Sequence, residues 1–148
     1  MIDSAIELSD DPARIDLGRV HGWLASSYWT PGIAREAVER QNAGSHCLGA
    51  YRSGHGQVGF ARMISDRASF AWLADVWVDE SVRGQGIGRQ MVRWFVEHPD
   101  YATVRRFALT TADAHGVYAA LGFTPLLRPE RVMERLSPEF AAMLRVAP

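Results

Sequence analysis

The chain has 148 residues, a formal net charge of −1 and a single cysteine, Cys47. This length suits one domain, and the near balance of 16 basic and 17 acidic side chains gives no electrostatic basis for binding nucleic acid or an anionic membrane. One cysteine cannot form an intramolecular disulfide, and the sequence has neither a bilayer-length apolar run nor the features of a signal peptide, so we expect a cytoplasmic protein with a small-molecule or peptide partner.

The first third of the chain predicts a short strand and two helices. Residues 5–8 form a weak strand pattern, and apolar residues recur at helical spacing from Ile15 to Tyr28. Thr30 followed by Pro31 is typical of an N-cap with proline at the first helical position. We therefore predict that a second helix begins there and ends near residues 42–44.

The rest of the chain predicts a hairpin, a buried strand and a further series of strands and helices. Apolar runs at 47–51 and 58–64 flank a glycine-containing turn, which indicates an antiparallel hairpin. The remaining predicted elements, in chain order, are a strand at 70–78, a helix at 87–98, a strand at 104–110, a helix at 114–121, and strands at 123–127 and 132–136. We expect the tail after residue 138 to be either a docked helix or loose, and residues 1–148 to form a single domain.

A glycine-rich segment joins the predicted strand at 70–78 to the helix that follows it. This glycine loop consists of Arg83, Gly84, Gln85, Gly86, Ile87 and Gly88. Glycines at a strand-to-helix turn allow backbone N–H groups to surround an anion, and the helix N-terminus adds the positive end of its dipole. The loop therefore predicts a ligand that carries phosphate.

The spacing of the glycines separates three kinds of phosphate loop. A Walker-type loop needs a lysine after its last glycine, and this chain contains no lysine. A dinucleotide loop needs a third glycine or alanine at position 89, which is Arg89. The pattern that remains, Arg-x-x-Gly-x-Gly, is met by Arg83, Gly86 and Gly88. With it the sequence resembles the GNAT superfamily of CoA-dependent N-acyltransferases, in which this loop wraps the pyrophosphate of acetyl-CoA.

The resemblance to GNAT proteins covers nearly the whole chain and is most specific from Ala74 to Phe123. It implies an α+β fold with a mixed, mostly antiparallel sheet of six to seven strands, flanked by about four helices and splayed between strands four and five. The pantetheine arm of acetyl-CoA would enter this splay, where backbone groups of Val76, Trp77 and Val78 would polarise the acyl carbonyl. The side chains of Val76 and Val78 would be ordinary buried strand residues.

Tyr118 is the catalytic acid that the resemblance implies. It lies four residues before Gly122, where GNAT proteins place the tyrosine that protonates the CoA thiolate. A phenol has an ordinary pKa of about 10, so it holds a proton at neutral pH that a developing thiolate can take. Many family members carry asparagine seven residues earlier, and this chain has Thr111, which can still donate one hydrogen bond to the cofactor.

The general base has two candidates in the sequence. Strand alternation places Asp75 on one face with Trp77 and Asp79, so Asp75 could point into the acceptor groove and accept a proton directly or through water. Equally, Asp75 could be a structural aspartate bonded to an arginine or a backbone amide. His115 is the second candidate, because histidine titrates near neutrality.

The other candidate residues are binding groups. Arg83 and Arg89 are expected to assist the backbone amides in holding phosphate. Aromatic residues at Tyr28, Trp29 and Trp72 either line an acceptor pocket or belong to the core. No metal site is expected, because His21, His46, His55 and Cys47 lack the spacing of metal ligands.

The sequence thus predicts an acetyl-CoA-dependent N-acetyltransferase that acts on a primary amine by direct attack in a ternary complex. The alternative is a non-catalytic sensor or regulatory domain that binds acyl-CoA without turnover. Homodimers are the commonest oligomers, and a homodimer is compatible with this hypothesis.

Overall fold

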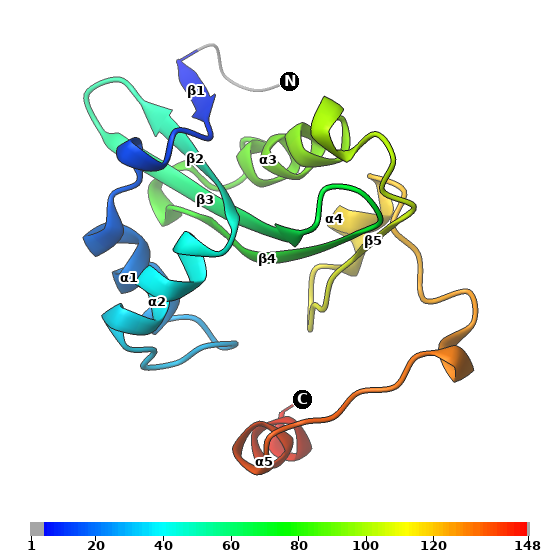
Figure 1. The fold of residues 1–148 in the computed structure, drawn as a ribbon. Coiled ribbons are helices and arrows are strands. Elements are labelled where there is room, and N and C mark those ends of the chain that lie inside the picture. The colour runs from blue at the N-terminus through cyan, green and yellow to red at the C-terminus, as the bar shows by residue number, and fades with distance from the viewer. Residues whose placement is uncertain (1–4, 148) are drawn as a thin grey trace. The chain divides into compact units, whose positions relative to one another are not determined.

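A computed structural model of the protein describes residues 5–147 (Figure 1). The contacts within the chain divide it into two compact units, unit 1 (Met1–Thr110) and unit 2 (Thr111–Pro148). Unit 1 contains the sheet and the glycine loop, and unit 2 contains Tyr118. The expectation of a single domain stays a prediction.

Unit 1 is built on a five-stranded mixed sheet. Its strands are β1 (Ile6–Ser9), β2 (His46–Arg52), β3 (Gly56–Ser65), β4 (Phe70–Val78) and β5 (Arg106–Ala108). They lie side by side in chain order; the first four pair antiparallel, and β5 pairs parallel with β4. The expected mixed, mostly antiparallel sheet is confirmed, but the expected six to seven strands are wrong.

Helices cover both faces of this sheet. Figure 1 shows α1 (Leu17–Ala25) and α2 (Arg35–Ala43) on one face and α3 (Ile87–Val96) on the other. The Asp16 carboxylate caps α1 by accepting a hydrogen bond from the N–H of Arg19. The helix α3 begins at Ile87, as the sequence predicts, so the last two residues of the glycine loop form its start, and its apolar side chains face the sheet.

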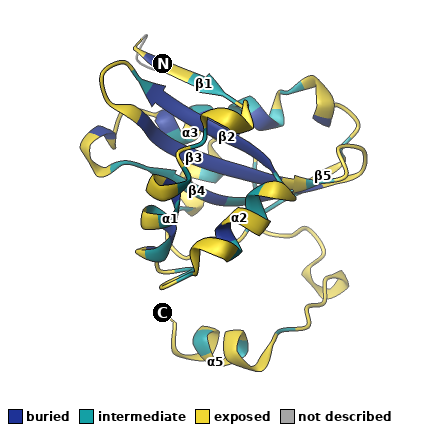
Figure 2. Cartoon of the chain, turned by 60° about the vertical axis from the view of Figure 1, so that its left-hand side comes forward, coloured by how far each residue is buried: buried dark blue, intermediate teal, exposed yellow. Residues whose placement is uncertain are grey.

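The core of unit 1 lies between the sheet and these helices. Figure 2 shows that the central strands β2 and β3 are buried over most of their length. On one face, Val20 and Leu24 of α1 pack with Val38 of α2 and Phe60 of β3. These side chains lose nearly all contact with water, and each contributes about 1.5–3 kcal/mol of hydrophobic stabilisation.

The segment between α1 and α2 differs from the sequence prediction. The second helix begins at Arg35 rather than after Thr30, because the Thr30 hydroxyl donates to the Leu24 carbonyl at the end of α1. The N–H of Gly32, which adopts a φ of +70°, donates to the carbonyl of Ala25. Residues 26–34 therefore form a loop held against the end of α1, and the prediction of an N-cap at Thr30 is wrong.

Unit 2 contains two helices, α4 (His115–Ala119) and α5 (Pro138–Val146). The two strands predicted at 123–127 and 132–136 are absent from the described chain, where residues 129–131 instead form a single 3₁₀ turn. Pro125, inside the first predicted strand, lacks the N–H that a strand ladder needs, and Pro129 between the two begins the 3₁₀ turn. The tail forms α5, capped by the Ser137 hydroxyl, so residues 5–147 contain five α-helices rather than about four.

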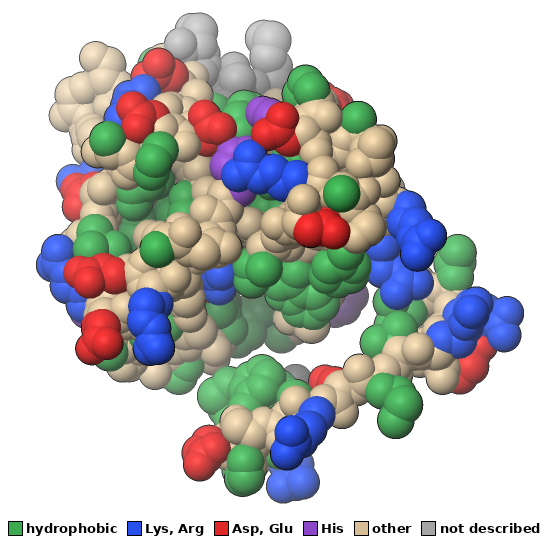
Figure 3. Space-filling model, viewed as in Figure 1, with side chains coloured by type: hydrophobic (Ala, Val, Ile, Leu, Met, Phe, Trp, Pro, Cys, Tyr) green, Lys and Arg blue, Asp and Glu red, His purple; other side chains and the backbone are tan. Residues whose placement is uncertain are grey.

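On the face that Figure 3 shows, acidic and basic side chains are interspersed.

No helix within residues 5–147 is both long and apolar enough to cross a membrane.

A buried histidine links the start of β2 to the chain after α3. His46 Nε2 lies 2.8 Å from Asp10 Oδ2, and Nδ1 lies 2.7 Å from the hydroxyl of Tyr101. A carboxylate can only accept, so Nε2 carries the proton and the Tyr101 hydroxyl donates to Nδ1. Burial raises the pKa of Tyr101 to about 12, so its hydroxyl keeps that proton. The neutral imidazole is therefore the form that these contacts satisfy.

Stability is expected to fall as the pH falls from 7.5 to 5. Burial lowers the pKa of His46 more than Asp10 raises it, so the unfolded chain takes up a proton at a higher pH than the folded chain does. The pKa of Asp10 lies below its ordinary value because of its hydrogen bond with His46, so that carboxylate stays ionised in this window. Thermal unfolding followed by circular dichroism should show a Tm several degrees lower at pH 5.

The matched control is the exposed His55 in the hairpin turn. His46→Gln should flatten the dependence of Tm on pH, whereas His55→Gln should leave it as in the wild type. An equal slope in both variants would show that His46 is not the responsible group.

Candidate functional site

The glycine loop has the backbone conformation that only glycine adopts without strain. Both Gly84 and Gly86 have a φ of +81°, and a side chain at either position would meet no atom within 4 Å. The second of these glycines is the N-cap of α3 and provides no side-chain cap. The loop is therefore shaped by its backbone and open to solvent on its outer side.

The backbone N–H groups from Gly84 onward have no acceptors among the residues that the structure describes. From Gly84 to Arg89, none donates a hydrogen bond to another described residue; the first such bond of the helix runs from the N–H of Gln90 to the carbonyl of Gly86. These donors sit at the positive end of the α3 dipole. The arrangement satisfies the requirements for binding a phosphate or pyrophosphate group.

Strand β4 packs closely against the start of α3. A side chain added at Gly88 would contact Val78 Cγ2 at 3.5 Å and Val76 Cγ1 at 3.9 Å. The side chains of Val76 and Val78 thus lie on the helix side of the sheet, next to the first turn of α3. Their position agrees with the interpretation that these side chains are structural.

The strands β4 and β5 pair only over a short region. Their register joins Phe70 to Arg106 and ends at Trp72 and Ala108, so residues 73–78 of β4 have no β5 partner. The pairing ends in the region where the sequence predicts a splay between strands four and five, and the splay itself stays a prediction. The open part of the β4 edge leads directly toward the glycine loop.

A β-bulge interrupts β4 inside this open region. The register with β3 runs from Arg62 opposite Ala74 to Phe60 opposite Trp77, so two residues of β4, Asp75 and Val76, face the one remaining residue of β3. At the bulge, Asp75 has a φ of +55°, in the left-handed region. Sequence alternation alone gave no indication of this irregularity.

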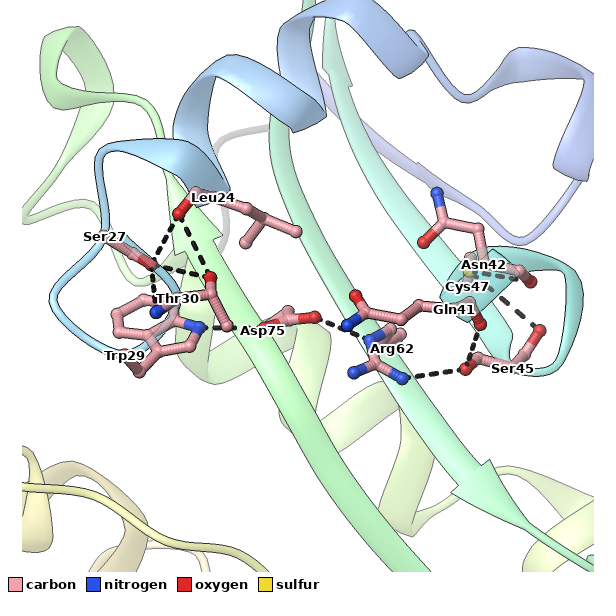
Figure 4. A network of polar contacts seen from close by, with 10 residues as sticks. All are labelled: Leu24, Ser27, Trp29, Thr30, Gln41, Asn42, Ser45, Cys47, Arg62 and Asp75. Atoms are coloured by element: carbon pink, nitrogen blue, oxygen red, sulfur yellow. Dashed lines mark hydrogen bonds and ion pairs between the residues drawn. The ribbon is translucent and has the colours of Figure 1, made fainter. Parts of the chain in front are cut away.

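The Asp75 carboxylate is buried and engaged at both oxygens. Oδ1 accepts a hydrogen bond from Trp29 Nε1 at 2.8 Å, and Oδ2 lies 2.6 Å from Arg62 Nε. Figure 4 shows Asp75 between these two residues, with Ser45 on the far side of Arg62. The geometry corresponds to the structural aspartate that the sequence left as an alternative. Arg62 is a residue that the sequence analysis missed, although an arginine inside the apolar run 58–64 was a signal for it.

Aromatic rings connect the α1–α2 loop to the glycine loop. The ring of Trp29 lies 5.0 Å from that of Tyr28 and 5.8 Å from that of Trp77, and the Arg83 guanidinium lies 5.1 Å above the Trp77 ring. Two of the three aromatic residues predicted for an acceptor pocket are thereby brought together. The third, Trp72, takes part in none of these described contacts and lies at the other end of β4, opposite Ile64.

The two loop arginines have different surroundings. Arg83 donates from Nε to the carbonyl of Val78 at 2.9 Å, which holds its side chain against β4. Arg89 is exposed on the first turn of α3. Arg83 is therefore already engaged by the strand, whereas Arg89 has room to reach a ligand.

The indole N–H of Trp77 is a buried donor without an acceptor among residues 5–147. Leaving such a donor unsatisfied costs about 1–3 kcal/mol. The sequence did not indicate this group.

The remaining predicted residues belong to unit 2. The N–H of Ala114 donates to the Thr111 hydroxyl at 3.0 Å, which leaves the hydroxyl proton of Thr111 available for donation. Tyr118 lies in α4 with its ring edge-on to Phe123 at 5.8 Å. His115 is the first residue of the same helix.

Neither a metal centre nor a reactive thiol is formed by the residues that the structure describes. Within residues 5–147, no group of three or more His, Cys, Asp or Glu side chains could hold a metal ion. Burial raises the pKa of the Cys47 thiol to about 11, so it is protonated at neutral pH and a weak nucleophile.

The sequence and fold are similar to those of acetyltransferases. Residues 43–125 match the acetyltransferase (GNAT) domain family. A crystal structure of a protein from Xanthomonas campestris assigned to the GNAT family is 40% identical, with a TM-score of 0.87 over 93% of this chain and 96% of that chain. A protein from Gibberella zeae assigned as an acetyltransferase is 29% identical over 126 residues, which span 72% of this chain and 71% of that protein.

More distant structures share the fold alone. Glucosamine-6-phosphate N-acetyltransferase from Arabidopsis thaliana is 12% identical, with a TM-score of 0.64 over 89% of this chain and 97% of that chain.

Proposed function

The chain belongs to the GNAT acetyltransferase family, and from this premise we propose that it transfers the acetyl group of acetyl-CoA to a primary amine of a small molecule or peptide. The observation that carries the proposal is the row of backbone N–H groups from Gly84 to Arg89 that have no acceptor among the described residues. Such donors at a helix N-terminus suit a pyrophosphate, which acetyl-CoA carries.

We propose that the donor is held mainly by backbone groups. The N–H groups of Gly84, Gln85, Gly86, Ile87 and Gly88 would bind the pyrophosphate oxygens, assisted by the Arg89 guanidinium. Arg83 would act indirectly, because its contacts with Val78 and Trp77 fix the start of the loop. The Thr111 hydroxyl would donate one further hydrogen bond to the donor.

The open edge of β4 would receive the acyl-bearing arm. Because residues 73–78 have no partner strand on the β5 side, backbone groups of Val76, Trp77 and Val78 can pair with an extended ligand there. A backbone N–H directed at the thioester oxygen would stabilise the negative charge that develops on it during attack.

Proton transfer would depend on residues of unit 2. We propose that Tyr118 donates its phenolic proton to the departing CoA thiolate. Asp75 is a poor base, because accepting a proton would break its contact with Arg62. The base is then His115 or a water molecule. The amine attacks the thioester directly, since the buried Cys47 thiol is not suited to form an acyl-enzyme.

Tyr28 and Trp29 would form one wall of the acceptor site. They lie in the loop that follows α1, and Trp29 is fixed by its bond to Asp75. A wall of this kind contacts the apolar part of an acceptor and leaves its amine free to face the thioester.

The proposal is tested by binding and turnover measured separately. Isothermal titration should show acetyl-CoA binding, and a thiol-reactive dye should show CoA release in the presence of a panel of small amines and peptides. Binding without release for every acceptor would favour the non-catalytic sensor. A chain that does not bind acetyl-CoA would contradict both interpretations.

A further inference from the structure

We infer that Arg62 and Asp75 form a positioning pair that holds the β4 bulge in the conformation needed to receive the acyl-bearing arm of acetyl-CoA. The inference rests on the proposed function and assigns a role to two buried residues that carry out no bond-making step.

The bulge is a strained feature that requires support. Within residues 5–147, the only non-glycine residues with positive φ are Arg67, in the turn between β3 and β4, and Asp75, inside a strand. The left-handed conformation costs a non-glycine residue about 1–2 kcal/mol. Such a conformation persists in the middle of a strand only when its surroundings fix it.

The surroundings of Asp75 supply that support. Its side chain is 4% exposed and that of Arg62 is 10% exposed, and the two are 2.6 Å apart. The arginine is held in turn by a 3.0 Å hydrogen bond from Nη1 to the Ser45 hydroxyl, and Trp29 holds the other carboxylate oxygen (Figure 4). The α1–α2 loop and the middle of β3 thus contact the carboxylate directly, and the turn before β2 holds the arginine.

The pair is poorly explained as a device for stability alone. Burying two charges costs much of the energy that their attraction returns, and a well-packed apolar pair is often as stable. The position of the pair indicates a conformational role, because Arg62 lies opposite Ala74, at the edge of the bulge.

The bulge decides which face the end of β4 presents. Without the extra residue, the pairing would shift by one position, and every side chain after it would change face. Val76 and Val78 would then leave the first turn of α3, and Trp77 would leave Trp29 and Arg83. The backbone groups that flank the acyl-bearing arm depend on this register.

The test compares two ligands that share the glycine loop. Acetyl-CoA contacts both the loop and the β4 edge, whereas ADP carries a pyrophosphate and has no pantetheine arm. In the Arg62→Met variant, titration calorimetry should show that the affinity for acetyl-CoA falls about tenfold or more. A displacement of the binding group by about 1 Å is enough for such a loss. The affinity for ADP should stay nearly unchanged.

Glycine provides the decisive rescue. It adopts positive φ without support, so Arg62→Met combined with Asp75→Gly should bind acetyl-CoA within about threefold of the wild type. The double variant removes both charges of the buried pair, so neither is left without its partner, which favours folding of this variant. Arg67→Met, which breaks the exposed Arg67–Asp100 pair at 2.9 Å, is the matched control and should change neither affinity.

The outcomes separate the two proposals. The positioning role is wrong if folded Arg62→Met binds acetyl-CoA as tightly as the wild type, or if the folded double variant is not rescued. If the wild-type chain itself fails to bind acetyl-CoA, the proposed function fails.

Discussion

Replacing Tyr118 by phenylalanine is expected to lower kcat by about 10²–10⁴-fold, the usual contribution of a general acid. The KM for acetyl-CoA should change little, because the backbone donors of the glycine loop are untouched. The phenylalanine ring preserves the edge-on contact with Phe123, and the backbone bonds of α4 do not involve the hydroxyl. The measurement is CoA release with the best acceptor found in the amine panel.

Tyr51→Phe is the control for removing a phenol. The Tyr51 hydroxyl is buried in the sheet without a hydrogen-bond partner in the described chain, so its loss should leave both kcat and KM unchanged. A Tyr118→Phe enzyme with the wild-type kcat would remove this residue from the mechanism, and the thiolate would then have to take its proton from water.

Replacing Gly86 by alanine should weaken acetyl-CoA binding by about tenfold or more, which corresponds to about 1.4 kcal/mol or more. The N-cap of α3 has a φ of +81°, where alanine costs about 1–2 kcal/mol, and relaxation of that strain would turn the loop N–H groups away from the pyrophosphate. Unlike Arg62→Met, this variant should weaken ADP binding equally, because both ligands use the loop. Titration calorimetry with both ligands measures the effect.

Gly54→Ala is a matched control for backbone strain. Gly54, in the turn between β2 and β3, also has a φ of +81°, and a side chain there would meet no atom within 4 Å. Both alanine variants should therefore lower the Tm by similar amounts, while only Gly86→Ala loses affinity. Equal affinity in the two variants would exclude the glycine loop as the phosphate site.

Elements with strong local patterns were predicted well. The sequence predicted the strand at 70–78 with its observed bounds, and the β2–β3 hairpin within two residues at each end. A run of apolar residues bounded by glycine or by a charged turn is enough to indicate a strand from local sequence.

Predictions went wrong where local propensity competed with other contacts. Hydrogen bonds with the end of α1 replaced the N-cap expected at Thr30. Of the two strands expected after Gly122, the first contains Pro125, and neither forms in the described chain.

The glycine pattern and the family resemblance could be recognised without a structure, and they predict a phosphate-binding loop. Both depend on residues close together in the chain, where the absence of lysine and the identity of Arg89 decide between loop types. The spacing of the glycines sets the backbone conformations that the loop can adopt, so the loop type can be recognised without knowing any distant contact.

The surroundings of Asp75 follow only from contacts made in the folded chain. Its two partners lie 46 and 13 residues away in the chain, and neither distance follows a helical or strand period. The left-handed bulge that these contacts hold is unfavourable for an aspartate considered alone, so local sequence could not predict it. The structure thus places this candidate base in a buried ion pair beside the open edge of β4, because long-range contacts there outweigh the local preference of the strand.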